Sequence, residues 1–139
     1  FPYTTLFRSQ RDAHEDFINC LNDMLHEPMH GVAHCFTGNV DQMKAYLDMG
    51  LYIGITGWIC DERRNDELIQ AVKQLPIDRV LIETDSPYLI PRSIKKSRRN
   101  EPMHLPVIAE KLAKEMGIEP SKLVTNTVSN SMKLFNLSN

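Results

Sequence analysis

Residues 51–86 read LYIGITGWICDERRNDELIQAVKQLPIDRVLIETDS, and this stretch decides the fold. Its two apolar runs, 51–55 and 79–84, have the length and composition of strands that are buried on both faces. Between these runs, residues 61–75 carry apolar side chains at helical spacing, and Pro76 ends the expected helix. A strand, a helix of this length and a second strand make the βαβ pattern of a parallel sheet.

The same alternation of strands and helices continues on both sides of this stretch. Residues 31–36, GVAHCF, form a third apolar run of strand length. We also expect helices at 12–25, 40–49, 103–116 and 120–137, and a loop at 88–102. The segment 4–7 is either a short edge strand or part of a foreign start of the chain. The pattern predicts an α/β fold with three parallel strands.

Several helix ends are marked by residues with known capping preferences. Asp12 and Glu15 have the spacing of a capping box for the first helix. Asn39 is suited to cap the second helix, and Gly50 stands directly after its expected end. Gly117 likewise stands directly after the helix that is expected at 103–116.

The composition restricts the class of protein. The chain has 139 residues, of which 42% are hydrophobic and 24% charged, and its formal net charge is −2. These values suit one globular unit and exclude a strongly basic surface over the whole chain, although a local basic patch stays open. No apolar run approaches the roughly 18 residues of a membrane span. Cys20, Cys35 and Cys60 have no CxxC spacing, so we expect the reducing cytoplasm. We also expect no membrane association and no stable protein partner.

Polar side chains stand at the ends of two expected strands, where parallel α/β proteins bind their ligands. His34 lies near the end of 31–36, and Glu83 and Asp85 lie at the end of 79–84, on one face because they are two residues apart. A histidine and carboxylates suit a divalent metal ion. The alternatives are a packed histidine, a backbone hydrogen bond for Glu83 and turn capping for Asp85.

Basic side chains gather in the loop at 88–102, which is either simply solvated or a phosphate-binding edge. They are Arg92, Lys95, Lys96, Arg98 and Arg99. The single tryptophan, Trp58, is expected either as a stacking platform for a nucleobase or as a packing lid. The candidate phosphate-binding residues are Arg63, Arg64, Arg98 and Arg99.

Four segments resemble the TatD family of metal-dependent deoxyribonucleases. They are HCFTGN at 34–39, YIGITGWICDERR at 52–64, IETDSPYL at 82–89 and RRNEP at 98–102. The segments occur in the family's order, and the resemblance extends from about Gln10 to the C-terminus. It implies that residues 10–139 are the C-terminal part of a (β/α)8 TIM barrel, with its last three βα units and its C-terminal helices. A complete barrel of this kind has about 250 residues.

The resemblance also implies an activity, which is 3′→5′ hydrolysis of phosphodiester bonds in single-stranded DNA or RNA. The implied cofactor is a divalent cation, with Mg²⁺ expected first and Mn²⁺ or Zn²⁺ as alternatives. His34 and Asp85 match metal ligands of the family, and Asp85 also matches the residue that helps to activate the attacking water. Glu83, Asn100 and Glu101 fall in family motifs and are candidates to support these ligands by hydrogen bonds.

The sequence departs from the family in its expected ligands. It contains neither the HxH pair of the family's first strand nor the Glu of its fourth strand, although the family site implies two metal ions. A further family histidine falls at Ser9. Residues 1–9, FPYTTLFRS, resemble a translated sequencing adapter, and we expect them to be non-native.

These departures leave three functional hypotheses. The first is a fragment of a nuclease that is inactive by itself, because only two of the expected metal ligands are present. The second is a metal-dependent amide or ester hydrolase with a related barrel. The third is a truncated, non-catalytic chain that requires a partner. The basic segments of the chain favour phosphate and therefore the first hypothesis.

Overall fold

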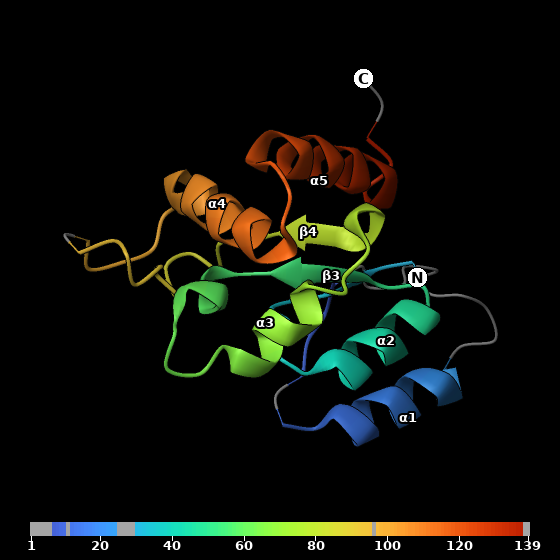
Figure 1. Ribbon diagram of the computed structural model, residues 1–139. Helices are drawn as coiled ribbons and strands as arrows, with labels where there is room; N and C mark the ends of the chain where they lie inside the picture. Colours follow the sequence, from blue (N-terminus) through green and yellow to red (C-terminus); the bar gives the residue numbers. More distant parts are fainter. Residues whose placement is uncertain (1–6, 11, 25–29, 96, 138–139) are drawn as a thin grey trace.

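The computed structural model describes residues 7–10, 12–24, 30–95 and 97–137 of the chain. Its sheet has four parallel strands in the order β1-β2-β3-β4 (Figure 1). They are β1 (Phe7–Arg8), β2 (Val32–Ala33), β3 (Tyr52–Ile55) and β4 (Val80–Ile82). The parallel arrangement of β3 and β4 confirms the βαβ interpretation of residues 51–86.

Five α-helices connect and cover these strands. They are α1 (His14–Met24), α2 (Val40–Asp48), α3 (Asp66–Val72), α4 (Leu105–Met116) and α5 (Pro120–Leu134). Three short 3₁₀ turns accompany them, η1 (Gly57–Cys60), η2 (Ile77–Arg79) and η3 (Pro102–His104). In Figure 1, α1, α2 and α3 lie below the sheet, whereas α4 and α5 lie above it. From α2 to α5, each helix packs against the next one.

Three predicted helix ends are confirmed. The Asn39 side chain accepts from Gln42 N at 3.0 Å, and the Gln42 side chain accepts from Asn39 N at 3.2 Å, which is a capping box. Gly50 and Gly117 follow α2 and α4 with left-handed φ angles of 89° and 67°. Glycine adopts such angles without the steric strain that a Cβ would add, so it ends these helices cleanly.

Two predicted helix starts are wrong. Asp12 has a left-handed φ of 54°, and α1 begins at His14 instead. The helix that was expected at 61–75 is shorter and begins at Asp66. Asp61 instead lies in a turn before the helix, where its side chain binds Arg63 and Arg64.

The number and length of the strands also differ from the prediction. A fourth strand, β1, pairs in parallel with β2, with Phe7 opposite Val32, where three strands were expected. The strand that was expected at 31–36 shortens to β2, because Cys35 has a left-handed φ of 50° and turns the chain. The segment 4–7, for which an edge strand was one alternative, lies outside the described residues except at its last position.

Side chains from both faces of the sheet are buried. One set belongs to the main core beneath the helices and consists of Ala33, Ile53, Ile55 and Val80. The other set packs with Leu134 of α5 and consists of Val32, Tyr52 and Leu81. His34 and Glu83 follow Val32 and Leu81 by two positions, so they continue the second face beyond the strand ends. No described helix has the length and apolar composition that crossing a membrane requires.

Candidate metal centre

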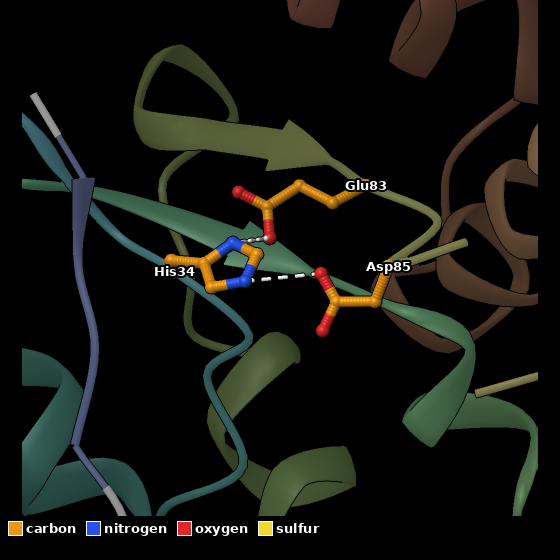
Figure 2. A group of neighbouring side chains, drawn as sticks. All are labelled: His34, Glu83 and Asp85. Atoms are coloured by element: carbon orange, nitrogen blue, oxygen red, sulfur yellow. Dashed lines mark ion pairs between the residues drawn. The ribbon is translucent and has the colours of Figure 1, made fainter. Parts of the chain in front are cut away.

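Three side chains that the sequence singled out lie together beyond the carboxyl ends of β2 and β4. Figure 2 shows the His34 ring between the carboxylates of Glu83 and Asp85. His34 Nδ1 is 2.8 Å from Glu83 Oε2, and His34 Nε2 is 3.0 Å from Asp85 Oδ1. One ligand atom from each residue lies within 4.8 Å of the others. Among the described residues, this is the group of His, Cys, Asp and Glu side chains that is compact enough for a metal ion.

The space for this group exists because β3 has a glycine beside it. The register of β2 and β3 pairs Ala33 with Ile53, which sets His34 next to Gly54. A Cβ at Gly54 would collide with the Glu83 carboxylate. The carboxylate therefore occupies the space that a side chain would fill, and from there it reaches His34. A larger residue at position 54 would displace Glu83 from the imidazole.

Glu83 is bound on two sides, which makes it a support for the imidazole. Its Oε2 accepts from Cys35 N at 3.1 Å, and the same oxygen contacts His34 Nδ1. The left-handed turn at Cys35 places that N–H beside the carboxylate. A metal-binding histidine commonly donates its other ring nitrogen to a carboxylate, which fixes the ring and its tautomer. This arrangement leaves His34 Nε2 and Asp85 Oδ1 as the natural pair for a metal ion.

The environment of His34 favours its protonated form when no metal is bound. The hydrogen bond to Glu83 raises the pKa of His34 above its ordinary value of 6.5. Burial opposes this effect, whereas the negative charges of Glu83 and Asp85 add to it. Because metal binding requires a neutral imidazole, a divalent ion must displace this proton.

This pKa shift predicts a specific pH dependence. In the metal-free chain, we expect the His34 ring signals in NMR spectra to titrate with a midpoint above 6.5. Since the pKa is raised on folding, the contribution of His34 to stability is fully present below pH 6.5 and is lost as the pH rises through the raised pKa. Glu83→Gln removes the largest cause, so the midpoint should fall. An unchanged midpoint in a folded Glu83→Gln protein would contradict this account.

Asn100 and Glu101 lie apart from the three-residue group. Asn100 is only 1% exposed, and its Nδ2 donates to the Thr84 carbonyl at 2.6 Å. Thr84 lies between Glu83 and Asp85 in the sequence. Glu101 accepts from Arg99 Nε at 3.2 Å and takes part in a capping box with His104 at η3. Asn100 therefore contacts the backbone of the site, whereas Glu101 organises the approach to α4.

Two candidate phosphate-binding arginines are engaged by a buried aspartate. Arg63 binds Asp61 through Nε at 2.8 Å and Nη2 at 2.7 Å, and Arg64 Nε lies 2.9 Å from Asp61 Oδ2. The Arg63 guanidinium, helped by the charge of Arg64 and opposed by burial, holds the pKa of Asp61 well below its usual range. Arg64 also stacks on Trp58 at 3.7 Å, which favours a packing role for that ring. Part of the positive charge is therefore balanced within the chain.

The other two candidate arginines lie in the connection between β4 and η3. Arg98 is exposed, and the Arg99 side chain is 74% exposed while its Nε lies 3.2 Å from Glu101 Oε1. An exposed pair of this kind contributes little to stability. The two guanidinium groups are therefore accessible to an anionic ligand.

Sequence reasoning missed two supporting features of the site. The first is the backbone N–H of Cys35, which donates to Glu83, because no sequence signal shows where an N–H points. Burial raises the pKa of the Cys35 thiol to about 11, so it is protonated at neutral pH when no metal is bound. The second is His104, whose Nδ1 lies 2.9 Å from Asn100 Oδ1. Its spacing of three residues from Glu101 was the available signal.

The structure is thus an α/β protein with a candidate metal centre at the carboxyl edge of a parallel sheet. Residues 9–136 match the family described as TatD related DNase. The chain belongs to this family. The matched segment excludes residues 1–8, most of the segment that was expected to be non-native.

Individual relatives agree with this assignment. The chain is 47% identical over 133 residues to the 3′-5′ ssDNA/RNA exonuclease TatD of Salmonella typhimurium, covering 94% of this chain and 51% of the relative. A hydrolase TatD family protein from Entamoeba histolytica is 29% identical with a TM-score of 0.82, over 96% of this chain and 51% of that one. A TatD homologue from Escherichia coli K12, 22% identical, shares the fold with a TM-score of 0.84 over 95% and 50% of the two chains. The chain spans about half the length of the curated relatives it matches.

Proposed function

We propose that this chain forms part of the metal centre of a 3′→5′ exonuclease that acts on single-stranded DNA or RNA. The observation that carries the proposal is the pair of His34 Nε2 and Asp85 Oδ1, 3.0 Å apart, with Glu83 holding the other ring nitrogen. The similarity to a 3′-5′ ssDNA/RNA exonuclease that is 47% identical supports the choice of substrate. The exposed Arg98 and Arg99 supply positive charge for a phosphate backbone.

The donor atoms fit a small divalent cation. An imidazole nitrogen and a carboxylate oxygen suit Mg²⁺ and Mn²⁺, and they suit Zn²⁺ as well. Such an ion supplies charge neutralisation and polarisation at the scissile phosphate. In this arrangement His34 Nε2 and Asp85 Oδ1 would hold the cation, while Glu83 keeps the imidazole oriented. The second carboxylate oxygen, Asp85 Oδ2, is suited to accept a proton from the attacking water.

We further infer that the four strands correspond to part of a (β/α)8 barrel, with residues 10–139 as its C-terminal part. The overlap with about half of the E. histolytica protein supports this inference. The family site would then draw further ligands, and a second metal ion, from strands whose HxH and Glu residues this sequence does not contain. We therefore expect the chain alone to bind metal and substrate without efficient turnover.

The experiment that tests the proposal measures binding of Mn²⁺ and of a fluorescent single-stranded oligonucleotide. We expect saturable Mn²⁺ binding that is lost in His34→Ala. We also expect Mn²⁺ to tighten oligonucleotide binding in the wild-type chain, and EDTA to reverse this effect. Oligonucleotide binding that is the same with Mn²⁺, with EDTA and in His34→Ala would overturn the proposal. Cleavage of a chromogenic ester, with no metal-dependent binding of the oligonucleotide, would favour the amide or ester hydrolase instead.

A further inference from the structure

The turn that carries Asp85 has an unusual backbone. After β4, Glu83 N still donates to Ile55 O at 2.9 Å, but the chain then leaves the sheet. Asp85 and Leu89 have left-handed φ angles of 56° and 53°. Residues other than glycine keep such angles only where surrounding contacts hold them. The position of the Asp85 carboxylate opposite His34 therefore depends on what holds this turn.

One residue, Asn100, holds the turn at three carbonyl groups. Its side-chain Nδ2 donates to Thr84 O at 2.6 Å and to Leu89 O at 3.3 Å. Its backbone N–H donates to Pro87 O at 2.9 Å. Thr84 is the residue between Glu83 and Asp85, so the shortest of these bonds fixes the backbone that joins the two carboxylates.

The opposite side of the Asn100 side chain is fixed as well. Its Oδ1 accepts a hydrogen bond from Glu101 N at 3.0 Å and lies 2.9 Å from His104 Nδ1. His104 is only 9% exposed. A carboxamide donates on one side and accepts on the other. An aspartate at position 100 would instead point a negative oxygen at two carbonyl oxygens, and an alanine would leave the half-buried carbonyls of Thr84 and Leu89 without this donor.

We propose that Asn100 is a positioning residue for the metal centre. It sets the turn at residues 84–89 so that Asp85 Oδ1 stands opposite His34 Nε2, and it does so without contacting the ion. The inference rests on the proposed function, because it assumes that His34 and Asp85 bind a metal ion. In this role Asn100 holds the backbone between Glu83 and Asp85 and does not bind either carboxylate.

The chain offers a matched control at the other end of the same strand. Asn130 is also 1% exposed, and its Nδ2 also donates to two backbone carbonyls, Ile77 O and Val80 O, both at 2.9 Å. These bonds join α5 to the start of β4, whereas Asn100 acts beyond the end of β4. A purely structural role predicts that the two residues are equivalent, and a positioning role predicts that they differ.

The test compares Asn100→Ala, Asn130→Ala and the wild-type chain by Mn²⁺ titration and by thermal unfolding. We expect both variants to melt at a lower temperature than the wild type. At a temperature where all three proteins are folded, Asn100→Ala should bind Mn²⁺ about 10- to 100-fold more weakly, as when a residue that orients metal ligands is lost. Asn130→Ala should keep the wild-type affinity, and the Mn²⁺ EPR spectrum should change only in Asn100→Ala.

The outcomes separate this inference from the proposed function. Wild-type Mn²⁺ affinity in a folded Asn100→Ala protein, or an equal loss in Asn130→Ala, would overturn the positioning role alone. Absence of Mn²⁺ binding in the wild-type chain would instead overturn the proposed function. If Asn100→Ala does not fold, His104→Ala takes its place, since it removes the contact to Asn100 Oδ1 and keeps Asn100. Its Mn²⁺ affinity should fall below that of Asn130→Ala, and an equal affinity would overturn the proposal.

Discussion

Asp85→Asn should reduce the Mn²⁺ affinity more than Asn100→Ala does, because it removes a charged ligand. Loss of a residue that only supports a metal ligand costs roughly 10- to 100-fold in affinity. Asparagine is the informative substitution, since it tolerates the left-handed φ of 56° at this position and keeps the volume of the side chain. The turn and its contacts to Asn100 should therefore persist. The loss then reflects the missing carboxylate charge opposite His34 Nε2, which isothermal titration calorimetry measures directly.

A buried aspartate outside the metal centre provides the control for this measurement. Asp61 follows η1 and forms its ion pairs with arginines, among them Arg63 and Arg64. Asp61→Asn should lower stability, because it weakens the ion pairs to Arg63, Arg64 and Arg92, but it should leave the Mn²⁺ affinity unchanged. Equal losses of affinity in Asp61→Asn and Asp85→Asn would show that metal binding does not depend on the His34–Asp85 pair.

Ser9→His should have the opposite effect and strengthen metal binding. The register of β1 and β2 pairs Arg8 with Ala33, so its continuation sets Ser9 beside His34 on the same face of the sheet. Ser9 is exposed, which leaves room for an imidazole. We expect Mn²⁺ to bind on the order of tenfold more tightly, equivalent to about 1.4 kcal/mol.

The neighbouring position tests whether this gain depends on geometry. Side chains of successive extended residues point to opposite faces, so a histidine at position 10 would face away from His34. Gln10→His should therefore leave the Mn²⁺ affinity unchanged. It also removes the hydrogen bond that Gln10 Oε1 accepts from Ala13 N at 3.0 Å. Equal gains in Ser9→His and Gln10→His would contradict the register argument, and no gain in Ser9→His would contradict the placement of Ser9 at the site.

The fold could be predicted where local chemistry and packing agree. Residues 51–55 are apolar throughout, and all but the first form β3 (Tyr52–Ile55), which is buried along its full length. Asn39 forms a capping box because its side chain accepts from a backbone N–H at the helix start that has no carbonyl partner within the helix. This interaction is local and does not depend on tertiary contacts. Asp61 misled the prediction, since an acid before an apolar helical stripe also resembles a helix start. Its tertiary role is to hold two arginines that follow it, and helical periodicity carries no information about such pairs.

The sequence predicted which side chains form the candidate site, but it did not predict the contacts that hold these side chains in place. His34, Glu83 and Asp85 were identified because strand ends of a parallel sheet converge, and the structure brings them together. The prediction that Glu83 and Asp85 share a strand face relied on an extended chain, whereas the chain turns at Asp85 with a left-handed φ. Asn100 holds this turn through the Thr84 carbonyl, and the Cys35 N–H holds the Glu83 carboxylate. Both depend on backbone angles that the residue types alone do not determine.

The separation of the site residues along the chain determines when the site can form during synthesis. Cys35 and Glu83, which bond to each other, are 48 positions apart, and Asn100 joins Thr84 across a further 16. A growing chain that ends before position 100 therefore has the histidine and both carboxylates but lacks the residue that fixes the turn between them. Because domains begin to fold while the chain is being made, at about 5–20 residues per second, helices such as α2 can form early. Loading of the ion would then be a late event that follows the emergence of residue 100 from the ribosome.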